Sequence, residues 1–202
     1  MRLHTMLFLP LLPLVTGVPN NWPIRRMSNV TGDIILGALF PIHERNAKYE
    51  CGRLQDEGIH QLEALLFTIK KINDDSTILP GVKLGVLALD SCDSTAYALE
   101  QTLDFIKGFI ARNNAHVERQ FLCHDGSVPV FRDGSFDRVV GIIGGQSSSV
   151  SIQLANLLRL FRVPQVSYQS TSPTLSNKEK YDYFFRTVPS DVNQAHAILE
   201  IL

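Results

Sequence analysis

The sequence has no excess of positive charge and few charged residues overall. Its 202 residues include 19 Lys and Arg against 20 Asp and Glu, which gives a formal net charge of −1. Without a basic field, the composition does not favour binding of nucleic acid or of an anionic membrane surface. Charged residues make up 19% and apolar residues 45%, as in an ordered globular chain that can bury a core. Any ligand preference must therefore come from local sites.

Common nucleotide-binding and hydrolase signatures are also missing. The sequence contains no GxxxxGK[ST] motif, no GxSxG motif, and no GxGxxG motif after its first predicted strand. Its histidines show no metal-ligand spacing, and no serine is paired with a recognisable base. We therefore expect a chain without enzymatic activity, metal or cofactor.

Cysteines are few. The three are Cys51, Cys92 and Cys123, and none has the CxxC spacing of zinc or thioredoxin-like sites. In a secreted chain, an odd number suggests one internal bridge and one thiol free for another chain.

Long apolar runs are confined to the first residues. Residues 1–17 contain a short basic start, an apolar stretch from Leu7 to Val15, and the small residues Thr16 and Gly17. The stretch is shorter than the ~20 residues that span a bilayer, so we expect a cleaved signal peptide. Asn29 lies in an Asn-Val-Thr sequon, which predicts glycosylation in the secretory pathway.

Beyond residue 32, apolar strand patterns alternate with helical ones. Such alternation predicts an α/β fold, with a parallel sheet flanked by helices. The expected strands are 33–40, 82–89, 138–143, 165–168 and 183–188, and the expected helices are 57–73, 95–112, 147–161 and 192–202. In this architecture, ligands bind at the carboxyl ends of the strands.

Hydroxyl side chains gather after two neighbouring strands. The segment GGQSSS, residues 144–149, links a strand to a helix, and SYQSTS, residues 167–172, follows the next strand. Free amides at a helix N-terminus, close backbone approach at glycines and serine hydroxyls together favour an anion. Asp191 follows the fifth strand and adds an acceptor for a cation, so the edge suits a free α-amino acid. The alternative is a turn with an ordinary N-cap serine.

These segments resemble a receptor family. GGQSSSVSIQLANLLRLFRVPQVSYQSTSPTLS and YFFRTVPSD are similar to the first lobe of the extracellular domain of metabotropic glutamate receptors, and by this resemblance group II is expected to be the nearest group. The resemblance implies a periplasmic-binding-protein-like type I lobe (a Venus flytrap) over residues 32–202, after an N-terminal segment 18–31. The second lobe, the cysteine-rich domain and the seven-helix domain are not in this sequence.

The resemblance also assigns roles to individual residues. Ser148, beside Ser147, resembles the residue that holds the ligand's α-carboxylate, and Thr171 resembles the threonine that bridges the α-carboxylate and the α-ammonium. Gln169 stands where the family contacts the amine through its backbone, and Asp191 where an aspartate faces the α-ammonium. The implied ligand is L-glutamate or a related amino acid.

One position departs from the family. Where an arginine or tyrosine usually helps to bind the distal carboxylate of glutamate, this sequence has Glu57, and Gln61 replaces a second arginine of group II. A carboxylate there would disfavour glutamate and shift the preference toward a neutral or cationic distal group. Glu57 can instead face solvent and cap its helix, and this alternative stays open.

The resemblance further implies how copies of the chain associate. It pairs Cys51 with Cys92 inside the lobe and assigns Cys123 to a bridge between two protomers of a homodimer. The implied dimer face lies on two helices and comprises Leu99, Leu103, Leu157, Leu160 and Phe161.

The expected function is the amino-acid-sensing lobe of a class C G-protein-coupled receptor. Its G protein would be reached through the absent membrane domain. The full receptor would lie in the plasma membrane with this lobe outside the cell, whereas a natural fragment of this length would be secreted. Alternatives are a soluble periplasmic-type binding protein and, less favoured, an enzyme that uses the hydroxyls for group transfer.

Overall fold

The computed structural model describes residues 26–46, 51–113, 124 and 139–201. The expected signal peptide and Cys123 lie outside these residues.

A six-stranded sheet forms the centre of the molecule. Its order is β1 (Met27–Val30), β5 (Leu84–Asp90), β2 (Ile34–Phe40), β6 (Val139–Gly144), β7 (Gln165–Ser167) and β8 (Phe184–Arg186). β1 runs antiparallel to β5, and all other neighbours are parallel. The chain passes from β2 to β5 on one side and then to β6 on the other, so the strand order reverses at β2. Such a reversal is the usual place for a ligand crevice in an open α/β sheet.

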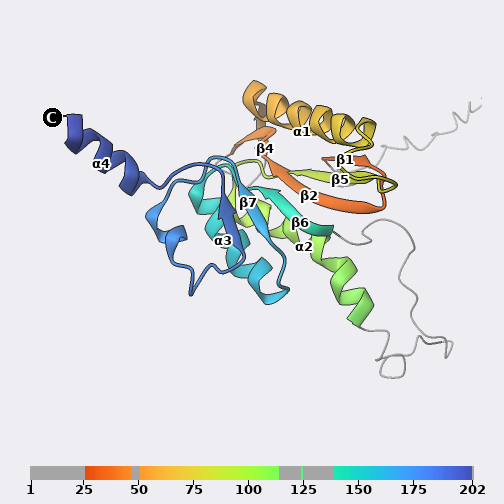
Figure 1. Cartoon of the computed structure of the whole chain (residues 1–202). Coiled ribbons are helices and arrows are strands. Elements are labelled where there is room, and N and C mark those ends of the chain that lie inside the picture. Colours follow the sequence, from red (N-terminus) through yellow and green to blue (C-terminus); the bar gives the residue numbers. More distant parts are fainter. Residues whose placement is uncertain (1–25, 47–50, 114–123, 125–138, 202) are drawn as a thin grey trace, which may run out of the picture.

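Helices cover both faces of this sheet (Figure 1). α1 (Asp56–Asp74) lies on one face, and α2 (Thr95–Asn113) and α3 (Ser148–Leu160) lie on the other. Successive strand residues point to opposite faces. Leu39 therefore packs in the cluster that contains Phe105 of α2 and Leu154 of α3, whereas Phe40 packs with Leu65 of α1. Burial on both faces explains why the central strands are almost entirely apolar.

Every strand and helix expected from the sequence is present, with ends that differ by no more than two residues. The α/β fold class is therefore confirmed. Four short elements were not predicted: β1, the two strands β3 (His43–Arg45) and β4 (Cys51–Leu54) that form a hairpin, and the 3-10 helix η2 (Pro173–Ser176). β1 lies within the segment 18–31 and pairs with the sheet of the predicted lobe.

The hairpin is attached to the sheet at the end of β5. A disulfide joins Cys51 to Cys92, with the two Cα atoms 5.2 Å apart. The buried Asp90 carboxylate accepts hydrogen bonds from the backbone amides of Ile42 and Cys92 at 3.0 and 2.8 Å, and it pairs with the ring of His43. These bonds position the chain that leads into α1.

The last helix, α4 (Asp191–Ile201), extends away from the sheet and has no buried residue (Figure 1). Its apolar residues Val192, Ile198 and Leu199 are 45%, 52% and 68% exposed. None of the helices in the described ranges combines the length and the apolar character that a membrane span requires.

Candidate functional site

The two hydroxyl clusters meet at the carboxyl edge of the sheet. The segment after β6 leads into α3, and the segment after the neighbouring β7 lies against it. The backbone amide of Ser172 donates a hydrogen bond to the Ser148 hydroxyl oxygen at 3.2 Å, across 24 residues of sequence. The sequence prediction that these clusters lie side by side is therefore confirmed by their geometry.

The turn between β6 and α3 depends on glycine. Gly144 has φ +136°, and a Cβ there would lie 2.3 Å from the Leu39 carbonyl oxygen, so no larger residue fits. The turn delivers Ser147 to the N-cap of α3 with extended backbone angles, yet its side chain makes no capping hydrogen bond. The first amides of the helix, with their partial positive charge, therefore lack the usual serine cap.

Three of the hydroxyls are internal and do not face a ligand. The carbonyl oxygen of Gly145 accepts hydrogen bonds from Ser151 at 2.9 Å, Ser167 at 2.7 Å and Ser170 at 3.1 Å. All three serines are fully buried. We call this group the serine knot. It holds the β6–α3 turn against the end of β7. The sequence pattern did not predict which serines would be bonded internally in this way.

Three other hydroxyl residues of the two clusters are less buried. Ser147, Ser148 and Thr171 are half-buried at the mouth of the turn. Because Ser148 accepts its bond from Ser172, its own O–H remains able to donate. These three groups and the N-terminal amides of α3 form a cradle suited to a carboxylate.

Asp191 lies beside this cradle. It is the first residue of α4, its side chain is exposed, and its backbone amide donates to the Thr171 carbonyl oxygen at 3.0 Å. Arg186 holds the same loop by donating to the carbonyl oxygens of Ser170 and Ser172 at 3.2 and 3.0 Å. Gln169 is exposed, and its amide donates to Ser167 at 3.4 Å. The expected contact positions Ser148, Thr171 and Asp191 thus lie on one edge.

Glu57 belongs to a hydrogen-bond group at the other end of the cradle. Its carboxylate accepts from the side-chain amides of Gln146 at 3.2 Å and Gln61 at 3.3 Å, and the Tyr168 hydroxyl donates to Gln61 at 2.8 Å. We call these four side chains the amide group. Burial and, second, the negative charge of Glu57 raise the pKa of Tyr168. The roles of Gln146 and Tyr168 could not be predicted from a local sequence pattern, because their hydrogen-bond partners are up to 107 residues away.

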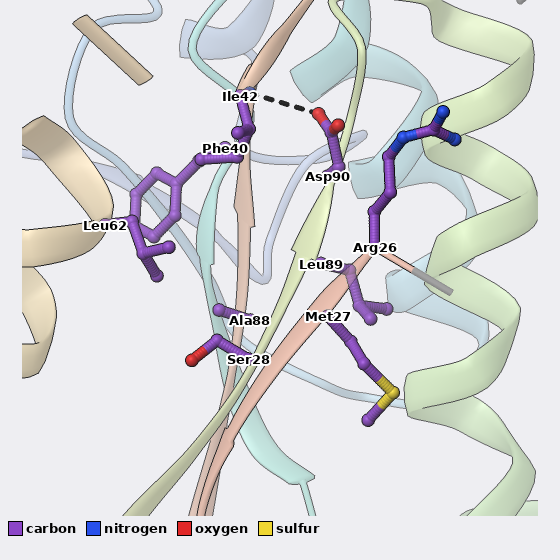
Figure 2. A pocket seen from close by; sticks show the side chains of 9 residues that line it. All are labelled: Arg26, Met27, Ser28, Phe40, Ile42, Leu62, Ala88, Leu89 and Asp90. Carbon is purple, nitrogen blue, oxygen red and sulfur yellow. Dashed lines mark hydrogen bonds between the residues drawn. The ribbon is translucent and has the colours of Figure 1, made fainter. Parts of the chain in front are cut away.

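A separate pocket of about 200 Å³ lies between β1 and α1. Figure 2 shows Phe40 of β2 beside Leu62 of α1, and the hydrogen bond from Ile42 to Asp90 at one end. The lining is mostly apolar and includes none of the hydroxyl residues. His43, Asp90 and Cys92 place their polar atoms within 4.8 Å of one another, but the Cys92 sulfur is in the disulfide and Asp90 is fully bonded. This cluster is therefore structural.

The expected dimer face is only partly turned outward. Leu103 of α2 and Leu160 of α3 are 46% and 76% exposed. Leu157 and Phe161 are half-buried and pack against the core, and Leu99 is also half-buried. The part of the face that could bind a second copy therefore centres on Leu103 and Leu160.

Comparison with known proteins agrees with this geometry. The family described as "Receptor family ligand binding region" matches residues 60–202. The chain is 44% identical over 198 residues to metabotropic glutamate receptor 4 of Rattus norvegicus, covering 97% of this chain and 21% of that protein. It is 43% identical over 196 residues to metabotropic glutamate receptor 6 of Oryctolagus cuniculus, covering 95% and 22%.

Two consequences follow from these relatives. They are receptors rather than enzymes, and receptors 4 and 6 belong to group III, so the expected nearness to group II is not supported. The chain spans about a fifth of the length of these relatives. The family match covers most of the chain, and the observed α/β fold agrees with it. The chain therefore belongs to the family of receptor ligand-binding regions.

Proposed function

We propose that this chain is most of the first lobe of an extracellular domain that binds the α-amino-acid part of L-glutamate or a related amino acid. The observation that carries the proposal is the pair of half-buried hydroxyls, Ser148 and Thr171, at the N-terminus of α3 with Asp191 beside them. The α-carboxylate would lie in the cradle of hydroxyls and helix amides, and the α-ammonium would face Asp191.

The wider role rests on the relatives named as metabotropic glutamate receptors. We infer that the lobe acts in a class C receptor at the outer face of the plasma membrane. There it would form a homodimer and reach a G protein through a membrane domain outside this sequence. One edge of one sheet is only one wall of a cleft, so signalling requires a second lobe that closes on the ligand by a hinge motion.

The test uses the complete receptor and pairs of probes that differ at the α-carbon. L-Glutamate and L-lysine are compared with their decarboxylated forms, γ-aminobutyrate and 1,5-diaminopentane, and with their deaminated forms, glutarate and 6-aminohexanoate. The proposed contacts all go to the α-carboxylate and the α-ammonium. Whichever of the two amino acids binds more tightly, its decarboxylated and deaminated forms should therefore bind much more weakly than it does. Equal binding by a parent and its decarboxylated form would contradict the proposal.

A further inference from the structure

The charged and polar groups of the candidate site follow the strand order of the sheet. Glu57, at the start of α1, lies next to Gln146 at the end of β6. The cradle of Ser148 and Thr171 comes next, between β6 and β7, and Asp191 follows β8. The edge therefore presents an acid, an anion-binding cradle and a second acid, in that order.

The first of these acids is held in place. Two amide N–H groups, from Gln61 and Gln146, donate to the same carboxylate oxygen, Oε1 of Glu57. Tyr168 in turn fixes Gln61 by donating to its side-chain oxygen. Gln146 immediately precedes Ser147, so the carboxylate lies within about one side-chain length of the cradle. Glu57 lies in the first turn of α1, where a negative charge is favourable, and it is bonded both by Gln61 of the same helix and by Gln146 of another segment.

This carboxylate has no cationic partner in the described part of the chain. The ion pairs found there join His43 to Asp90, Arg45 to Asp93, Lys107 to Asp104 and Arg159 to Asp182. The groups that bond Glu57 are neutral amides, which position a negative charge without cancelling it. Glu57 is exposed, and both of these bonds go to Oε1, so among the described residues none bonds its second oxygen, Oε2.

We propose that this site selects α-amino acids whose side chain ends in a cation, a primary amine or a guanidinium. The inference rests on the proposed function, because it takes the α-carboxylate to lie in the cradle. From that anchor, a side chain directed along the edge away from Asp191 ends at the Glu57 carboxylate. A cationic end forms a charge-assisted hydrogen bond there, whereas an acidic end meets a like charge fixed in position.

The experiment is a competition-binding series on the complete receptor. The probes are L-lysine and L-arginine, the neutral side chains L-norleucine and L-glutamine, and the acidic L-glutamate. On the wild type, lysine or arginine should bind at least about tenfold more tightly than norleucine and more tightly than glutamate. Glu57→Gln keeps the size of the side chain and one acceptor oxygen for Gln61 and Gln146, but removes the charge. It should reduce the preference for lysine over norleucine by about tenfold and should strengthen glutamate binding.

Glu63→Gln is the matched control, because Glu63 is an exposed acid on the same helix and outside the amide group. It should leave the order of the probes unchanged. If glutamate binds most tightly to the wild type, or if Glu57→Gln leaves the order unchanged, the inference is wrong while the proposed function stands. If no amino acid binds, the proposed function itself is contradicted, and this inference with it. Cell-surface staining of each variant confirms that the receptor reaches the membrane.

Discussion

The Ser172 amide lies 3.2 Å from the Ser148 hydroxyl oxygen and donates to it, joining the segment that follows β7 to the first residue of α3. This bond occupies the acceptor side of the Ser148 hydroxyl and leaves its O–H to donate. Ser148 therefore has a structural part in this edge and, under the proposed function, a free donor for the ligand.

Removing a cradle hydroxyl should weaken ligand binding. Ser148→Ala or Thr171→Ala removes a donor to a charged carboxylate, which costs about 1.5–3 kcal/mol, or roughly 10- to 150-fold in affinity. The measurement is the dissociation constant of the most potent amino acid on the complete receptor. Thr77→Ala is the control, since Thr77 is exposed beyond the far end of α1 and its hydroxyl donates to Asp75. Unchanged affinity in Thr171→Ala would contradict the assignment.

Substitutions in the serine knot should act on stability. Ser170→Ala removes a buried hydroxyl that donates within the knot, and the loss should lower the free energy of unfolding by about 1–3 kcal/mol. Ser149→Ala, at an exposed position, should change it by no more than about 0.5 kcal/mol. Urea unfolding of the purified wild type and of both variants measures these free energies of unfolding. Equal stabilities would show that the knot contributes little.

Tyr168 should make stability fall at high pH. Its pKa in the folded state is raised above the value of about 10 in an unfolded chain. Below about pH 10 both states keep the proton and the stabilisation is complete; above it only the unfolded state releases the proton, so stability is lost as the pH rises. Between about pH 9 and 11, the free energy of unfolding should decrease less steeply in Tyr168→Phe than in the wild type. If the free energy of unfolding falls equally steeply with pH in Tyr168→Phe and in the wild type, Tyr168 does not have this role.

The outward leucines should contribute to dimer formation. Replacing Leu103 and Leu160 by glutamate puts charge on exposed positions, so the fold should tolerate both changes. A dimer that buries this face should lose affinity, because an apolar contact becomes a charged one. Sedimentation of the purified ectodomain of the receptor, with Cys123→Ser in both proteins so that no disulfide at this position links the protomers, measures the effect. Leu158→Glu, at a position 1% exposed, should instead prevent folding. An unchanged dimer in the double variant would place the interface elsewhere.

Cys123 should form the bridge between protomers. The disulfide between Cys51 and Cys92 leaves it as the third cysteine of the sequence. On non-reducing electrophoresis, the complete receptor should lose its covalent dimer band in Cys123→Ser. A band that persists would assign the crosslink to a cysteine outside this sequence.

The sheet and its helices could be predicted because their signal is local. The run from Ile34 to Phe40 is apolar because the strand is buried on both faces, and the spacing of Leu62, Leu65 and Ile69 marks the inner face of α1. β1 and the β3–β4 hairpin were missed because strands of three or four partly polar residues carry too little periodicity.

The sequence could also predict that the two hydroxyl clusters lie side by side, but not the part each side chain plays. The order of the strands places both clusters at the carboxyl edge of the sheet, where the Ser172–Ser148 hydrogen bond joins them. Whether a serine faces inward depends on contacts such as Ser167 with Gly145, 22 residues apart, and the partner of Glu57 is 89 residues away. No local pattern contains that information.

The serine knot has a consequence for comparisons between species. Ser151, Ser167 and Ser170 all serve one carbonyl oxygen, so selection for the shape of this edge preserves them whatever molecule the cleft receives. Descendants that changed or lost their ligand would keep much of the serine-rich string. Ancestry can be traced through the knot, whereas inheritance of the proposed ligand recognition would be followed at Glu57, Ser148, Thr171 and Asp191.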